Sequence, residues 1–188
     1  MSLPTRELLD FLLARAQSRD RHDYLLRPDL GRRLDAQSVE QLAPMRTAAQ
    51  VFDLVLVLGD GLSALGVQLH GAALLGAIRR ALDPAVRLGP LMVVRKARVA
   101  LADEVGERLG AGAVAMVVGE RPGLSSPDSL GIYLAHAPRV GCSDAQRNCI
   151  STWLFRESHR IGLKGVGLKD QSGLPLTGLP PGARAELA

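Results

Sequence analysis

The sequence is poor in the residues that several functional classes require. It has only six aromatic residues (three Phe, two Tyr and one Trp), so no base-stacking surface for single-stranded nucleic acid is expected. Its two cysteines, Cys142 and Cys149, are too few for a disulfide framework, and their spacing matches no zinc motif. No apolar run is long enough to cross a bilayer, and no secretory signal begins the sequence. These absences predict a soluble intracellular protein with no metal site, membrane partner or nucleic-acid partner.

Charge and apolar content are those of an ordinary folded domain. The 188 residues are 47% hydrophobic and 22% charged, which excludes a disordered chain. The 23 basic and 19 acidic residues give a net charge of +4, without a Lys/Arg block. Scattered arginines favour pairing with carboxylates or phosphates over a DNA-binding face.

The N-terminal third predicts helices joined by an extended arm. Leucines at helical spacing predict an amphipathic helix over residues 5–19. The Arg27-Pro28 pair disfavours a helix, so residues 24–34 are expected to be extended, with a basic turn at 31–33. Asp35 or Ser38 then caps a helix over roughly 36–50.

The rest of the chain alternates between apolar strands and helices. Continuous apolar runs are typical of buried parallel strands, and amphipathic segments between them predict covering helices. The expected strands are 52–58, 91–94 with 98–101, and 114–118, and the expected helices are 64–82, 101–109 and one beyond Cys149. We therefore predict an α/β fold: an open, mostly parallel, Rossmann-like sheet with flanking helices and an N-terminal helical segment. The predicted division is 1–35 (N-terminal helix and arm), 36–170 (α/β domain) and 171–188 (loose tail).

Two glycine-rich turns follow predicted strands, at Gly59–Ser63 and Gly119–Leu124. Ligands of open α/β sheets bind beyond the carboxyl ends of the strands, where glycine allows close approach and helix N–H groups bind anions. The alternative is a pair of tight turns. Gly59-Asp60-Gly61 matches the dinucleotide fingerprint only with Ala64 in place of the last glycine, and Asp60 would repel a pyrophosphate.

Charged pairs near these turns have two interpretations each. Glu120-Arg121 is either an exposed turn pair or a polar pair directed into a cleft, with Glu120 as hydrogen-bond acceptor. Arg32-Arg33 either clamps a phosphate or carboxylate, or forms an interface salt bridge, which is the better default.

No catalytic set emerges from the remaining candidates. Cys149 has no histidine near it in sequence, and a buried thiol is the commoner role. His70 and His136 have no Ser or Cys partner that the sequence can justify. The residues alone predict a binding domain with a cleft.

Several segments together resemble the small subunit of ethanolamine ammonia-lyase. The resemblance covers about residues 5–151, and its order and spacing are specific although no single segment is. The segments are 27–34, 60–63, 94–99, 118–124, 128–130, 138–139 and 147–151.

The resemblance implies the function. This family uses adenosylcobalamin (coenzyme B12) to convert ethanolamine to acetaldehyde and ammonia. A large barrel-shaped subunit carries the substrate site, and the small subunit closes over the cobalamin at the interface of a hetero-oligomer. The implied location is cytoplasmic, with a bacterial microcompartment as a further option.

The resemblance also carries three cobalamin contacts onto this chain: Val99, Glu120 and Cys149. Val99 would offer an apolar wall, Glu120 would accept hydrogen bonds from amide groups around the macrocycle, and Cys149 would present a small group or a backbone N–H. No catalytic residue and no cobalt ligand is implied.

Departures from the family pattern leave alternatives open. The segment before Tyr24 and the loop after Ser151 are shorter than the family's. One alternative is a degenerate small subunit that binds cobalamin poorly. Another is a free-standing nucleotide- or phosphate-binding α/β protein that uses the Gly59–Ser63 turn.

Overall fold

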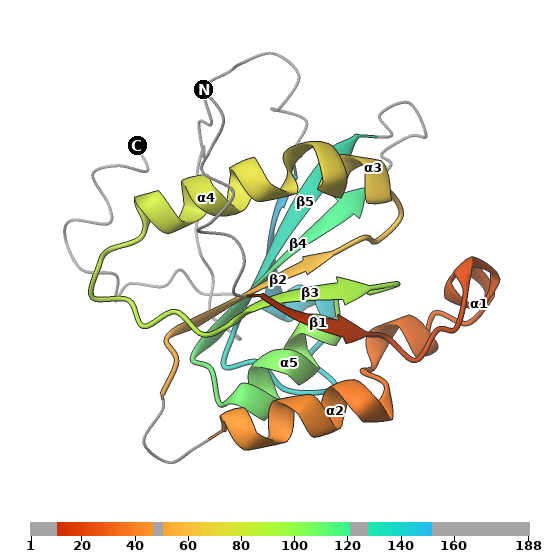
Figure 1. Cartoon of the computed structure of the whole chain (residues 1–188), viewed down its shortest axis with the longest axis horizontal. Coiled ribbons are helices and arrows are strands. Elements are labelled where there is room, and N and C mark those ends of the chain that lie inside the picture. The colour runs from red at the N-terminus through yellow and green to blue at the C-terminus, as the bar shows by residue number, and fades with distance from the viewer. Residues whose placement is uncertain (1–10, 47–50, 121–127, 152–188) are drawn as a thin grey trace.

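A six-stranded sheet with helices on both faces forms the molecule (Figure 1). The computed structural model describes residues 11–46, 51–120 and 128–151. The strands are β1 (Phe11–Arg15), β2 (Leu54–Gly59), β3 (Leu91–Arg95), β4 (Ala113–Glu120), β5 (Ser129–His136) and β6 (Arg147–Ser151). The helices are α1 (Arg21–Leu26), α2 (Ala36–Leu42), α3 (Ala64–Gly66), α4 (Ala72–Ala81) and α5 (Leu101–Leu109). None of the described helices is both long enough and apolar enough to cross a bilayer.

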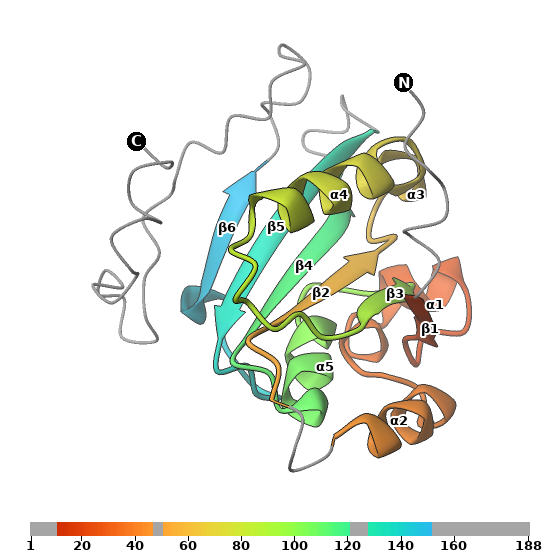
Figure 2. The same ribbon diagram turned by 60° about the vertical axis from the view of Figure 1, so that its left-hand side comes forward.

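The sheet is mixed, in the order β1-β3-β2-β4-β5-β6. β1, β3, β2 and β4 are parallel, whereas β5 and β6 run antiparallel to their neighbours. Figure 2 shows β6 at the edge beyond β5. The predicted α/β class and the parallel centre are confirmed; the two antiparallel strands were not predicted, and the Rossmann-like character stays a prediction.

Central strands are buried on both faces. Along β2, Val55 and Val57 join the core that α2 and α5 cover, while Leu56 and Leu58 join the core under α4. This two-sided burial explains why the run is apolar without alternation. The strand predictions for β2, the start of β3 and β4 are confirmed.

The predicted helix over 5–19 is wrong for residues 11–19, because 11–15 form β1 and 16–19 are not helical. Residues 5–10 lie outside the described part. Burial here alternates: Ala14, Ala16 and Ser18 are buried, whereas Phe11 and Leu13 are exposed. The apolar side chains thus serve a strand period of two, and parallel pairing with β3 satisfies their backbone.

Two other local predictions need correction. Residues 21–26 form α1 and 30–32 a 3-10 turn, so the segment 24–34 is not extended; α1 still ends just before Arg27-Pro28. Residues 98–101 are not a strand, because the chain turns at Lys96, whose φ is +58°, and enters α5.

Helix boundaries follow local capping chemistry. Asp35 caps α2 by accepting the Ser38 N–H, as predicted, although α2 ends at Leu42 and continues only as a 3-10 turn over Ala43–Met45. The predicted helix over 64–82 is continuous from α3 to α4 through one π-helical turn, Val67–Gly71. Left-handed Gly110 ends α5, as predicted.

Two adjacent carboxylates are buried in the first turn of α5. Glu104 accepts hydrogen bonds from the Leu34 N–H (3.0 Å), Arg33 Nε (2.9 Å) and Arg108 Nε (2.9 Å). Asp103 pairs with the equally buried Arg147 of β6. The two acids therefore tie the segment before α2 and the far edge of the sheet to one helical turn.

Replacing Glu104 tests this tie. Burial by itself raises the pKa of Glu104, but the Leu34 N–H and the two guanidinium groups outweigh it and hold the pKa below the ordinary value of 4.5. Its contribution is therefore present above that value and is lost as pH falls through the lowered pKa. We expect Glu104→Gln to reduce the free energy of unfolding by about 2 kcal/mol near neutral pH, and by less in acid.

Urea unfolding of the full chain, followed by circular dichroism at neutral pH and in acid, measures the loss of unfolding free energy at each pH. Exposed Glu40→Gln on α2 is the matched control and should change little. Equal free energies of unfolding of the two variants at neutral pH would show that Glu104 does not stabilise the fold in this way.

Candidate functional site

The carboxyl ends of the parallel strands meet at one edge of the sheet, which Figure 1 shows at the side of α1 and α3. β2 ends at Gly59 and β4 at Glu120, and β5 begins at Ser129, opposite Glu120. Open α/β sheets bind ligands at such an edge.

The Gly59–Ser63 turn packs directly on the backbone of β4. Leu62 N–H donates to the Gly119 carbonyl at 2.8 Å, and Ser63 N–H donates to the same oxygen at 3.3 Å. Gly61 is left-handed (φ +52°), and a side chain on Gly119 would overlap the Ser63 carbonyl. These glycines thus serve close packing, and the two N–H groups are not free for an anion.

Glu120, Tyr133 and Cys149 form a cluster over β4, β5 and β6. The Tyr133 hydroxyl donates to Glu120 Oε1 at 2.9 Å. Cys149 is the direct cross-strand partner of Tyr133 and is exposed. Gly131 leaves room for the contact between Glu120 and Tyr133, because a Cβ on this residue would lie 3.1 Å from both Glu120 Cγ and Tyr133 Cε2. The structure thus brings two of the three predicted contacts to one tyrosine.

Tyr133 keeps its proton in this cluster. Burial raises the pKa of Tyr133 above its ordinary value of 10.0, and the negative charge of Glu120 and its hydrogen bond raise it further. Tyr133 is therefore a donor at neutral pH and fixes the orientation of the half-buried carboxylate. The other oxygen of Glu120 accepts no hydrogen bond from the residues that the structure describes.

Val99 lies elsewhere than predicted. It is not at the end of a strand but on the loop between β3 and α5. Its half-buried side chain packs against the α5-side core, the same core that Tyr133 flanks. Val99 and Tyr133 therefore pack against the same core.

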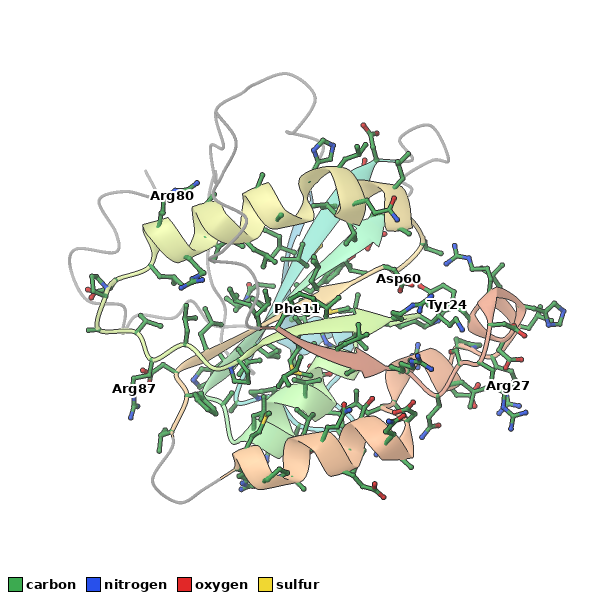
Figure 3. All side chains as sticks on the ribbon, viewed as in Figure 1. Phe11, Tyr24, Arg27, Asp60, Arg80 and Arg87 are labelled. Atoms are coloured by element: carbon green, nitrogen blue, oxygen red, sulfur yellow. The ribbon has the colours of Figure 1, made fainter. Side chains whose placement is uncertain are left out.

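The loop that carries Val99 is held by a stack that the sequence did not predict. Buried Tyr24 lies between two guanidinium groups, with Arg21 Cζ at 4.8 Å and Arg98 Cζ at 4.7 Å from the ring centroid. Arg98 Nη2 also donates to the Tyr24 carbonyl at 2.7 Å. Burial raises the pKa of Tyr24, against the opposing effect of the two arginines. Figure 3 shows Tyr24 near Asp60 at this edge.

β6 is anchored two residues before Cys149. Arg147 donates to Asp103, to the Cys142 carbonyl (2.8 Å) and to Asp144 (2.5 Å). Burial acts to raise the pKa of Asp103, and Arg147 acts against it. Because the ion pair is enclosed, it fixes the position of β6 over α5, and with it the position of Cys149 beside Tyr133.

Other polar residues in the described part of the chain lie close to one another. Arg33 pairs with Glu104, which favours the salt-bridge interpretation for that residue. His70 on the π-helical turn lies 3.9 Å from Asp128. Asp20, His22 and Asp23 lie close enough together for a cation, but Asp20 is the N-cap of α1. Arg121 lies outside the described residues, as do residues 152–188, on which the helix predicted beyond Cys149 and the predicted tail fall.

These features define a class of protein: an α/β domain with a mixed six-stranded sheet, in which Glu120 at the end of β4 contacts a tyrosine of the next strand. Over residues 2–159 the chain matches the sequence model of the family described as ethanolamine ammonia-lyase light chain. It belongs to this family, as the resemblance predicted, and members of the family are subunits of a lyase.

Individual proteins similar to this chain carry the same family name. The ethanolamine ammonia-lyase small subunit of Rhodopseudomonas palustris is 42% identical over 221 aligned positions, covering 92% of this chain and 84% of that protein. The small subunit of Ralstonia nicotianae is 46% identical over 183 positions, covering 88% and 68%. The first alignment is longer than this chain, so that relative carries internal segments that the chain lacks.

A titration of the two tyrosines tests the cluster. In a Tyr24→Phe background only Tyr133 remains, and we expect its phenolate absorbance to appear above the ordinary pKa of 10.0. Adding Glu120→Gln removes the negative charge that disfavours the phenolate, so the midpoint of the Tyr133 titration should fall by roughly one pH unit.

Ultraviolet absorbance of the folded full chain against pH gives both values, and circular dichroism reports whether the fold persists. Glu40→Gln is the control for loss of one carboxylate. If Glu120→Gln left the midpoint of the Tyr133 titration unchanged, the result would contradict the hydrogen bond between Tyr133 and Glu120.

Proposed function

We propose that this chain is the cobalamin-holding small subunit of an adenosylcobalamin-dependent ethanolamine ammonia-lyase. With a large barrel-shaped subunit it would form a cytoplasmic hetero-oligomer, with a microcompartment as a further option, that converts ethanolamine to acetaldehyde and ammonia. The observation that carries the proposal is the cluster of Glu120, at the carboxyl end of β4, with Tyr133 and its strand partner Cys149 in a chain of this family.

The chemistry of the cluster fits a corrinoid. The corrin ring has an apolar face and a rim of amide side chains. Glu120 offers a carboxylate oriented by Tyr133, so amide N–H groups would meet a fixed acceptor. Exposed Cys149 adds a small group at the edge, and Val99 adds an apolar surface. We therefore assign the three residues to holding the cofactor.

This division assigns no reacting group to the chain. Adenosylcobalamin, when bound, supplies the radical chemistry, and the protein supplies binding and orientation. The Tyr24 stack holds the loop of Val99, and the Asp103–Arg147 pair holds β6. Both keep the predicted contacts in place without touching substrate.

The alternative of a nucleotide-binding turn at Gly59–Ser63 is less well supported. Its Leu62 and Ser63 N–H groups already donate to Gly119. Arg21, which lines a cleft of about 490 Å³ beside the turn, donates to the Gly61 and Leu62 carbonyls at 2.7 and 2.9 Å. A degenerate small subunit stays an alternative, because relatives carry segments that this chain lacks.

Reconstitution tests the proposal. The full chain is mixed with the large subunit of a relative and adenosylcobalamin, and the corrinoid that co-elutes on gel filtration is read from its visible spectrum, alongside acetaldehyde release. We expect Glu120→Gln to weaken cobalamin binding about tenfold, because a charge-assisted acceptor is lost. Its effect on turnover at saturating cofactor should be smaller.

Glu40→Gln serves again as the matched control and should bind normally. A complex that forms without retaining a corrinoid would support the degenerate alternative. Equal cobalamin affinity for the Glu120 and Glu40 variants would overturn the role given to Glu120.

A further inference from the structure

A basic cavity lies at the ends of β1 and β3, apart from the cluster on β4 to β6. Its volume is about 330 Å³, at the lower end of small-molecule sites. Four basic residues and a single acidic one line it, together with two small residues: Arg15, Arg19, Arg95, Lys96, Asp35, Ala16 and Ser18. The lining thus carries an excess of positive charge over a small volume.

The sheet itself forces two of these cations together. Arg15 and Arg95 are the last residues of β1 and β3 and are direct partners in the parallel register. Like charges on neighbouring positions of a sheet are destabilising. Neither guanidinium has an acceptor among the residues that the structure describes, so an anion between them would relieve the repulsion.

The one acid does not offset this charge fully. Asp35 accepts the Ser38 N–H at 2.8 Å as the cap of α2, so its carboxylate is already engaged. Lys96 is held at the cavity by a hydrogen bond to the Arg19 carbonyl, and its backbone is left-handed. A non-glycine residue is kept in such a conformation mainly where the surroundings or a function require it.

A buried hydroxyl in the same cavity is a second, independent indication of a ligand. Ser18 lines the cavity, is 4% exposed, and its Oγ has no hydrogen-bond partner among the described residues. Buried polar groups are normally satisfied, and an unpaired one calls for an explanation. A bound anion would accept from this hydroxyl after rotation about its Cα–Cβ bond.

We propose that this cavity binds a phosphoryl anion, with Arg15 and Arg95 as its principal ligands. Guanidinium forks bind phosphate oxygens in a bidentate manner, which suits two arginines side by side. The anion has two sources, a free phosphate group or the phosphodiester of cobalamin's nucleotide tail. Only the second source depends on the proposed function.

The first arm uses inorganic phosphate alone. Isothermal titration of the full chain, with chloride at equal ionic strength as reference, should show binding that Arg15→Gln and Arg95→Gln each weaken about tenfold. Arg80→Gln removes the same charge from α4, at the opposite end of the molecule from Tyr24 and Asp60 (Figure 3), and should have no effect. Circular dichroism confirms that each variant is folded.

The second arm compares adenosylcobalamin with adenosylcobinamide, which lacks the nucleotide and its phosphodiester. If the cofactor supplies the anion, the complexes of the Arg15 and Arg95 variants lose affinity for the cobalamin only. If a free phosphate is the ligand, phosphate affinity falls and affinity for both corrinoids stays.

Two results would overturn the site. One is no phosphate binding by the native chain, or equal binding by the Arg15, Arg95 and Arg80 variants. The other is that the Arg15 and Arg95 variants bind the large subunit more weakly while their phosphate affinity is unchanged. That result would assign the two arginines to a carboxylate of the partner subunit. Phosphate binding without any corrinoid binding would refute the proposed function and leave this site standing.

Discussion

The first turn of α5 holds the two flanks of the sheet through two buried carboxylates. Glu104 accepts from the Leu34 N–H and the Arg33 guanidinium of the segment before α2, and from Arg108 of α5 itself. Asp103 pairs with Arg147 of β6. Enclosed charges tolerate little displacement, because breaking one pair leaves its partner buried and uncompensated. The positions of the segment after β1 and of β6 therefore depend on the same two residues of one helix.

The candidate cofactor site depends on the same anchored elements. Cys149 follows Arg147 by two residues, so the anchored strand places it beside Tyr133, and Tyr133 orients Glu120. Glycines at the same edge let the turn after β2 lie against β4, which closes the sheet edge with backbone contacts. Such an arrangement suits a subunit that grips a large cofactor against a partner chain.

The sequence predicted what local physics determines. Two-sided burial makes β2 and β4 continuously apolar, and capping residues such as Asp35 and Gly110 end helices visibly. The strand β1 was missed because leucines mask its period of two. β5 and β6 were missed because glycine and polar residues interrupt their apolar runs. Position after a strand indicated Glu120, but its contact with Tyr133 arises from pairing of separate strands, and Val99 and Cys149 came from resemblance alone.

The thiol of Cys149 offers the most direct measurement. The chain has two cysteines, so alkylation of the assembled complex, followed by mass spectrometry, reports Cys149 with Cys142 as the internal reference. We expect adenosylcobalamin to slow alkylation of Cys149 several-fold relative to Cys142, because the corrin edge would cover this thiol. An unchanged ratio of the two rates, with cobalamin shown to be bound, would contradict this expectation.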